Sequence, residues 1–364
     1  MRRGKSERTA AAALLALTAA LLLFLSEGTD PAVSAVESSG QTSAVRLKKY
    51  TATFVGAMDT VTTLTAWCAD EAVFQRASDA AGEELNRLSA LYDRYAPDSA
   101  LSRLNGAGGQ AVPIPEELSE LLRYCREEND RYPGFSIALG RVTDLWEQAR
   151  QTGRLPAQQE LREAGRHTDL SDLRLEGETA ALDDPELCLD LGGVAKGDAA
   201  DRVAALLYSQ GLDCFLLSCG ESSLVCAGTP PDGNWKVGVR HPDAVLNLSG
   251  TENPPALLGT LSLSGRCIAV SGDYQQYFCA DGTYYSHLID PETLYPARYY
   301  RCVCVLADTA REAEIASKSL FVAPPERARA IAAREGLSAL WVRPDGTVIT
   351  TADFPGKGSW EPEE

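Results

Sequence analysis

Residues 189–201 read Leu-Asp-Leu-Gly-Gly-Val-Ala-Lys-Gly-Asp-Ala-Ala-Asp. This segment predicts an apolar strand that ends at Asp190, a turn at the double glycine and a helix over 199–210. Glycines at such a turn let a ligand approach the backbone closely, and the free N–H groups at a helix start favour an anion. Lys196 beside them suits a phosphate or pyrophosphate. The same pattern is also typical of an ordinary turn, so the segment alone leaves both interpretations open.

The composition of the whole chain excludes several classes of protein. The chain has 364 residues, of which 45% are hydrophobic and 23% charged, so it can bury a substantial core. Its net charge of −17, with no basic stripe, argues against nucleic acid as a partner. The ten cysteines are too sparse for a disulfide scaffold, and the lack of a CxxC pair argues against zinc. The GxxxxGK[ST], GxGxxG, GxSxG, HExxH and EF-hand patterns do not occur either.

The amino terminus has the layout of an export signal. Four basic residues among the first eight precede an apolar run over 9–25, and small residues follow it. This pattern predicts that residues 1–35 are either a signal peptide, cut after Ala35, or an uncleaved membrane anchor. Residues 36–45 are then a linker, and 46–364 form one domain. We expect that domain to be extracytoplasmic and anchored to the membrane.

Apolar periodicity and turn residues predict an α+β fold of mixed sheets and packed helices for this domain. Strand-like alternation extends over 47–65, with Met-Asp-Thr at 58–60 in its middle. Hairpins are expected around Asp-Gly at 281–282 and at 345–346. Helices are predicted over 79–95, 116–129, 157–164, 310–322 and 325–334, with a short one at 142–146, and strands over 214–218, 223–227, 235–240, 258–263, 267–270 and 301–306.

Three histidines occur in the chain, and one of them has an unusual setting. His167 and His241 lie in polar, loop-like sequence typical of the surface. His287 instead follows a predicted hairpin strand and precedes Asp290-Pro291, where the proline fixes an extended turn. A histidine beside an aspartate can act as an acid or base, or bind phosphate. Capping of the turn is the alternative, and the residues alone do not decide between the two.

Taken in order, these motifs resemble a known family, the ApbE-type FAD:protein FMN transferases. The resemblance extends from about residue 51 to residue 321 and includes seven motifs in the expected order. They are Met58-Asp-Thr60, Tyr95…Ser99…Leu104-Asn105, Gly134-Phe135, Asp190–Asp201, Trp235–Arg240, Ser271-Gly-Asp-Tyr274 and His287-Leu-Ile-Asp-Pro291.

The resemblance implies a fold, a reaction and partners. It implies a single ApbE-like domain related to the T-fold. Such enzymes bind FAD and let a Ser or Thr hydroxyl of an acceptor protein attack the pyrophosphate. FMN is attached through a phosphoester and AMP is released. The expected partners are therefore FAD and extracytoplasmic FMN-accepting redox proteins, with Mg²⁺ as the implied metal.

The resemblance also implies the roles of individual residues. His287 would be the acid or base at the transferred phosphate, and Asp290 competes with it for that role. The backbone carbonyl of Gly193 would face the magnesium ion. Contacts to FAD are implied for Met58, Tyr95, Gly134, Phe135, Ser136, Asp190 and Lys196.

Two positions on the expected helix at 310–322 depart from the family pattern. The family offers an Asp and, four residues later, a Thr as metal ligands, but here these positions are Glu314 and Lys318. Residues at i and i+4 share a helix face, so the Lys318 ammonium should lie beside the Glu314 carboxylate. An ammonium is not a metal ligand. Lys318 then either replaces part of the metal charge or alters the metal's ligand shell.

The departure at Lys318 leaves three functions open: an FMN transferase, an FAD-binding protein without transfer activity, and a metal-dependent FAD pyrophosphatase. A surface ion pair between Glu314 and Lys318 is the alternative interpretation of the two residues, but their register in a helix that otherwise matches the family favours the site. Ser136, where the family has Asp, and Leu294, where it has Gly, are further departures within the pocket.

Overall fold

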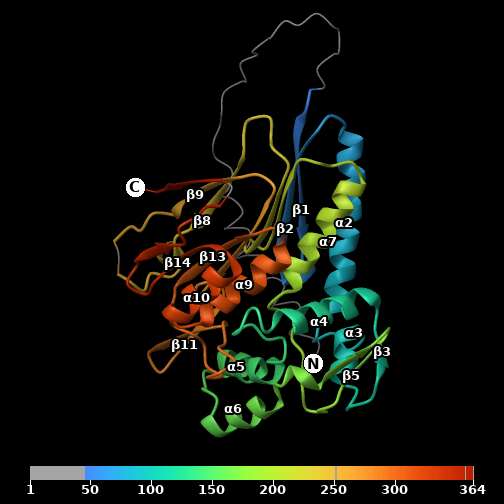
Figure 1. Ribbon diagram of the computed structural model, residues 1–364, viewed down its shortest axis with the longest axis vertical. Coiled ribbons are helices and arrows are strands. Elements are labelled where there is room, and N and C mark those ends of the chain that lie inside the picture. Colours follow the sequence, from blue (N-terminus) through green and yellow to red (C-terminus); the bar gives the residue numbers. More distant parts are fainter. Residues whose placement is uncertain (1–45, 251, 357, 364) are drawn as a thin grey trace, which may run out of the picture.

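The computed structural model describes residues 46–250, 252–356 and 358–363 (Figure 1). The predicted export segment at 1–35 and the predicted linker at 36–45 lie outside the described residues. Within the described part of the chain, no helix has both the length and the apolar character needed to cross a membrane. The described residues form mixed sheets and packed helices, which confirms the predicted α+β class.

An eight-stranded sheet in the order β1-β2-β6-β7-β10-β13-β14-β15 is the centre of the fold. All of its neighbouring strands are antiparallel. Alternating or continuous apolar residues along these strands bury at least one face of the sheet. The strands are β1 Lys48–Val55, β2 Val61–Cys68, β6 Phe215–Cys219, β7 Ser223–Ala227, β10 Arg266–Gly272, β13 Cys302–Ala307, β14 Ser338–Val342 and β15 Val348–Thr350.

Four helices pack with this sheet around the largest hydrophobic core (Figure 1). Asp70 caps the first of them and Thr309 caps the third, and each side chain accepts a hydrogen bond from a free helix N–H. Figure 1 shows α7 lying between α2 and α9, and the three helices are joined by many contacts. The helices are α2 Glu71–Tyr92, α7 Ala195–Ser209, α9 Ala310–Val322 and α10 Pro325–Glu335.

A second, smaller group of elements lies below the main sheet in Figure 1. It carries a three-stranded sheet in the order β3-β5-β4 and a two-stranded hairpin, β11–β12. A separate hydrophobic cluster around Trp146 joins α5, α6 and the hairpin. The elements are α3 Ala100–Asn105, β3 Val112–Pro113, α4 Glu116–Glu128, α5 Gly140–Thr152, α6 Gln158–Ala164, β4 Leu173–Glu176, β5 Thr179–Leu182, β11 Tyr277–Ala280 and β12 Thr283–Ser286.

The third sheet has the order β16-β9-β8 and packs beside the main sheet through its own core. Its strands are antiparallel, with an irregularity between Val239 and Arg240. The elements are β8 Trp235–Arg240, the short helix α8 Pro242–Val245, β9 Leu257–Leu263 and β16 Ser359–Pro362.

Two predictions about the 189–201 segment are wrong. No strand precedes the double glycine, because the extended backbone there pairs with a side chain: Asn105 accepts from the amide of Leu189 and donates to its carbonyl oxygen. The helix begins at Ala195 rather than at 199, because the amide of Ala195 already donates to the carbonyl of Leu191. Lys196 therefore belongs to the first turn of α7.

Two other helices extend further than the sequence predicts. α2 begins at Glu71 instead of 79, since Asp70 provides a cap and Phe74 extends the buried face toward the amino end. α5 covers 140–152 rather than 142–146, since Gly153 in the left-handed conformation ends it.

Candidate functional site

The double-glycine turn brings the start of α7 against α9. A Cβ atom added to Gly193 would lie 3.2 Å from the Phe135 ring and 3.4 Å from Cδ of Lys318. Glycine thus lets the backbone approach both side chains closely. Asp190 shapes the turn, since its Oδ1 accepts a hydrogen bond of 2.8 Å from the amide of Gly192. The structure therefore brings together the predicted residues Phe135, Gly193 and Lys318.

Glu314 is the centre of a buried charge cluster. Its Oε1 lies 3.1 Å from Nζ of Lys196 and 3.0 Å from Nζ of Lys318, and only 2% of its side chain is exposed. Its Oε2 accepts a hydrogen bond from the amide of Gly197. Burial alone would raise the pKa of Glu314, but the two lysines outweigh it and hold that pKa below its usual value. The carboxylate is therefore ionised, and each of its two oxygens has at least one hydrogen-bond donor.

The ammonium of Lys318 loses its proton more readily than that of an ordinary lysine. Burial lowers the pKa of Lys318 to about 8, Glu314 opposes this change and the neighbouring Lys196 adds to it. With two ammonium groups against one carboxylate, the cluster keeps a net positive charge at neutral pH. That charge lies beside the backbone of Gly193, where an anion could approach it.

Two aspartates in α7 fix the position of α9. Asp201 accepts hydrogen bonds of 2.8 Å from the amide of Ala310 and 2.9 Å from that of Arg311, so it binds the amino terminus of α9. Asp198 is buried and accepts from the hydroxyl of Tyr92 at 2.6 Å. Arg202 and Arg311 also donate to Asp198. The polar groups of the 195–201 segment therefore set the relative placement of the two helices that carry the charge cluster.

His287 lies at the end of the β11–β12 hairpin. The hydrogen-bond partner of Nδ1 determines which ring nitrogen carries the proton. Its Nδ1 is 3.1 Å from the carbonyl oxygen of Gln276, which only accepts, so Nδ1 carries the proton and Nε2 keeps its lone pair. The surrounding protein lowers the pKa of His287 to about 4, and Lys318, Lys196 and Arg150 repel a second proton. The side chain is nevertheless exposed to solvent.

Asp290 is placed as a turn residue. It is buried, and its oxygens accept from the amide of Glu292 at 2.9 Å and from the hydroxyl of Thr293 at 3.0 Å. Leu294 follows with a φ of 63°, a left-handed conformation that glycine adopts more easily. The carbonyl of Leu294 accepts from Nε1 of Trp146 at 2.8 Å, which anchors the turn. In the described structure the carboxylate of Asp290 thus stabilises the turn that follows His287.

Two further predicted residues of the flavin site, Gly134 and Ser136, lie on the loop between α4 and α5. Gly134 has a φ of 97°, and a Cβ there would be 2.7 Å from Cγ2 of Val322. Ser136 accepts a hydrogen bond from the amide of Ala138 through its hydroxyl. Both residues therefore hold the loop that places Phe135 against Gly193.

Tyr95 and Met58, the other predicted flavin contacts, lie on two further segments, one after α2 and one between β1 and β2. Tyr95 is 64% exposed, and the guanidinium of Arg94 lies 4.6 Å from its ring centroid. Met58 has a left-handed backbone with a φ of 55°, and its amide donates to the hydroxyl of Ser89 at 2.9 Å. A bulky residue in this conformation is strained, which is a frequent feature of binding sites.

The sequence analysis did not single out two residues of the site. Arg94 is nearly buried, and its Nη1 lies 3.6 Å from Oδ2 of Asp190. The sequence could have indicated Arg94, because it directly precedes Tyr95 of a family motif. Arg150 repels a proton on His287 and stands near Tyr95, which links α5 to the site. No local pattern in the sequence indicates that role.

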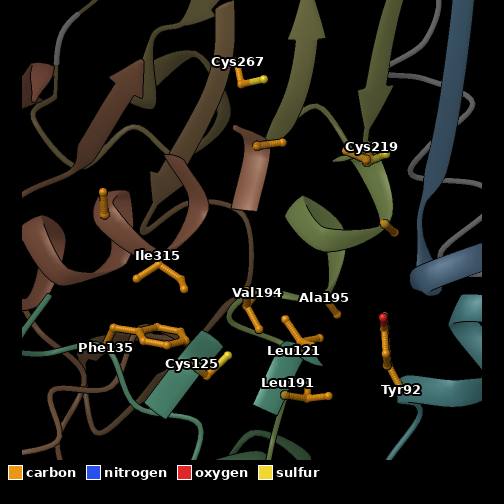
Figure 2. Close-up of a cluster of buried hydrophobic side chains, with 14 of the residues drawn as sticks. Tyr92, Leu121, Cys125, Phe135, Leu191, Val194, Ala195, Cys219, Cys267 and Ile315 are labelled. Atoms are coloured by element: carbon orange, nitrogen blue, oxygen red, sulfur yellow. The ribbon is translucent and has the colours of Figure 1, made fainter. Parts of the chain in front are cut away.

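Buried apolar side chains pack around the start of α7 and beside α9 (Figure 2). Figure 2 shows the ring of Phe135 under Ile315 of α9, with Val194 next to it. All three side chains are buried. The backbone that carries the charges therefore rests on a packed core, which keeps their geometry fixed.

Comparisons with known proteins find similar sequences over most of the chain. The model of the ApbE family matches residues 58–341. The FAD:protein FMN transferase of Escherichia coli K12 is 28% identical over 278 residues, which cover 74% of this chain and 77% of that protein. The one from Treponema pallidum is 30% identical over 275 residues, with coverages of 70% and 74%.

Solved structures give the same result. The flavin transferase ApbE from Vibrio cholerae superposes with a TM-score of 0.72 at 26% identity, covering 85% of this chain and 99% of that one. The ApbE protein of Thermotoga maritima gives a TM-score of 0.75 at 23% identity, with coverages of 85% and 98%, and this supports the fold.

Proposed function

This chain belongs to the ApbE family, and from that premise we propose how its own residues carry out flavin transfer. It is an FAD:protein FMN transferase, an enzyme that moves FMN from FAD to acceptor proteins. The observation that carries the assignment of the site is the pair of lysines on Glu314 beside the backbone of Gly193. A pyrophosphate needs positive charge and close access to the backbone, and this arrangement provides both.

The transfer is a substitution at phosphorus, and His287 is the residue suited to take the proton. A Ser or Thr hydroxyl of the acceptor attacks the phosphorus of the FMN half of FAD, and its O–H proton passes to Nε2 of His287. The bond from that phosphorus to the bridging oxygen breaks, and AMP leaves with the electron pair. The low pKa of His287 keeps its imidazole neutral and able to accept a proton at physiological pH. His287 is a better base than Asp290, since the turn uses both oxygens of Asp290.

The residues present do not fit a divalent cation at the position that the family uses. Glu314 offers the only carboxylate of the pair, and its oxygens already bond to two ammonium groups and an amide. Lys318 offers hydrogen-bond donors and no lone pair while charged. Across 46–250, 252–356 and 358–363 there is no group of three or more His, Cys, Asp and Glu residues arranged to hold a metal. No step of the reaction is therefore assigned to a metal here.

The cellular location of the enzyme is proposed from its amino-terminal sequence. The basic and apolar amino-terminal segment supports export and membrane association, which would bring the enzyme to extracytoplasmic redox proteins as acceptors. A fusion of residues 1–45 to a reporter that is active only outside the cytoplasm tests this point. Activity of the reporter supports export, and a reporter confined to the cytoplasm refutes it.

The transfer itself is tested with the full chain, purified in detergent, and a panel of FMN-accepting redox domains. FAD is added, and in-gel flavin fluorescence and intact mass are recorded on the denatured acceptors. Covalent FMN on an acceptor is the expected result. Intact FAD that stays bound indicates a flavin-binding protein, and free FMN without acceptor labelling indicates a pyrophosphatase. The Vibrio cholerae enzyme serves as the control that the acceptors are competent.

A further inference from the structure

Three hydrogen-bond donors already occupy the two oxygens of Glu314 at which a metal would bind. The two ammonium groups lie 3.0 and 3.1 Å from the same oxygen, Oε1, and the amide of Gly197 bonds to Oε2. These three donors come from two helices, so the arrangement does not depend on one flexible side chain. A divalent cation at this carboxylate would lie beside both ammonium groups and would be repelled by them.

We propose that Lys318, together with Lys196, supplies the positive charge that neutralises the FAD pyrophosphate, so that this chain transfers FMN without a divalent cation. The inference rests on the proposed function, because it concerns the charge that the same reaction needs. Transferred and leaving phosphates gain stabilisation from fixed cations as well as from metal ions, since the requirement is for positive charge at the developing negative charge.

The stem of Lys318 is placed so that its charge reaches the turn. Its Cδ and Cε would lie 3.4 and 3.7 Å from a Cβ on Gly193, so the alkyl chain runs along the glycine backbone. Phe135 closes the other side of the same glycine at 3.2 Å. Only 18% of the Lys318 side chain is exposed, and the protein thus fixes most of its rotamer freedom before any ligand binds. A fixed ammonium at a turn that glycine keeps open is a prepared anion site.

A purely structural role for the Glu314–Lys318 pair is the competing explanation. Buried ion pairs can be retained without contributing to a reaction. The two explanations differ in what happens when the lysine is exchanged for a residue that can ligate a metal. If the pair is structural, the exchange should not make transfer depend on a metal. If Lys318 acts as a built-in cation, that is, as the positive charge that replaces the metal, a metal should restore transfer after the exchange.

The experiment compares the full chain with Lys318→Thr/Glu314→Asp, Lys318→Met and Lys318→Arg, and Lys236→Thr is the matched control. Lys236 pairs with Glu361 on the far sheet, and both side chains are more than half exposed. FMN transfer to a competent acceptor is measured in EDTA and in millimolar Mg²⁺. Binding of Mn²⁺ in the presence of FAD is measured separately by electron paramagnetic resonance, and circular dichroism checks that each variant is folded.

The wild-type chain and Lys236→Thr should transfer FMN equally in EDTA and in Mg²⁺, and should bind no Mn²⁺ tightly. Lys318→Thr/Glu314→Asp should lose about 100-fold in EDTA, regain transfer with Mg²⁺ and bind one Mn²⁺ per chain. Lys318→Met should lose transfer in both conditions, and Lys318→Arg should keep its EDTA-resistant transfer.

Two results would overturn the inference: wild-type transfer that EDTA abolishes and Mg²⁺ restores, or tight Mn²⁺ binding by the wild-type chain with FAD. If no condition gives transfer while the Vibrio cholerae enzyme labels the same acceptor, the proposed function fails instead. Mn²⁺ binding by the double variant and not by the wild type would then still support the built-in cation.

Discussion

The amide of Gly197 donates a hydrogen bond to Oε2 of Glu314 across 117 positions of sequence. This contact joins the first turn of α7 to the middle of α9 at the charge cluster. It also requires a glycine, because a Cβ at position 197 would lie 2.6 Å from the carbonyl oxygen of Ala310 and 2.8 Å from Cα of Arg311. Both of these are backbone atoms, so they cannot turn away as a side chain could.

Gly197→Ala should therefore destabilise the protein and disturb the site. Separating α7 from α9 should lower the free energy of unfolding by about 1–3 kcal/mol and weaken FAD binding. Urea denaturation and a fluorescence titration with FAD measure the two effects. Gly106→Ala is the control, since the nearest atom to its Cβ would be the carbonyl oxygen of Ser102 at 3.3 Å. Equal stabilities of the two variants would contradict the close contact.

His287→Gln tests the assignment of the base. The variant should lower the rate of FMN transfer by about 10²–10⁴-fold, because the acceptor hydroxyl loses its proton acceptor. FAD affinity should change little, since the lysines that neutralise the pyrophosphate remain. His241→Gln is the control, because His241 caps the short helix α8. A variant that transfers FMN at the wild-type rate would remove His287 from the mechanism.

The pH dependence follows from the lowered pKa of His287. Its pKa in the folded chain is about 4, against an ordinary value of 6.5, so the imidazole stays neutral down to about pH 5. If the neutral form is the base, transfer stays available as pH falls through 6.5 and is lost only near pH 4. Stability decreases over the same interval, because the unfolded chain binds a proton there that the folded chain does not.

Nuclear magnetic resonance of the histidine ring protons measures this titration directly. The chain has three histidines, so His167→Gln/His241→Gln leaves His287 as the single signal. A titration midpoint near 6.5 would show that burial and the nearby cations do not lower the pKa of His287.

A buried ion network at the third sheet should have a large effect on stability. Arg301 donates to Asp243 at 2.7 Å and to Asp273 at 2.8 Å, and all three side chains are buried. Burial raises the pKa of Asp273 to about 7, and one of its oxygens has no partner. Arg301→Met leaves both carboxylates without their cation and should cost about 3–5 kcal/mol.

Thermal and urea unfolding measure the cost of Arg301→Met. Arg154→Met provides the comparison, because its pair with Glu160 lies on the surface at 3.5 Å and should contribute less than about 1 kcal/mol. A similar loss from both variants would mean that burial of the network does not determine its contribution.

The sequence predicted those parts of the fold that local pattern determines. The helices at 310–322 and 325–334 and the hairpin at 281–282 were confirmed nearly to the residue, since each has a capping residue or an Asp-Gly turn at its limit. The contact of Lys318 with Glu314 was also predicted, because i and i+4 face the same side of any helix.

The other parts of the site depend on long-range packing. Lys196 reaches the same carboxylate from a different helix, and the predicted helix start at 199 left Lys196 outside α7. The strand expected before the double glycine is absent because Asn105 satisfies that backbone from far along the chain. A partner this remote has no signature in the local sequence.

The proposed proton acceptor, His287, and the lysines belong to two different parts of the fold. Lys196 and Glu314 belong to the α7–α9 core, whereas His287 ends a two-stranded hairpin that packs on Trp146 within its own cluster. Substitutions in the hairpin can therefore change the surroundings of His287 without moving the groups that we propose hold the pyrophosphate. The proton acceptor and the cations of the site can in this way vary independently of each other.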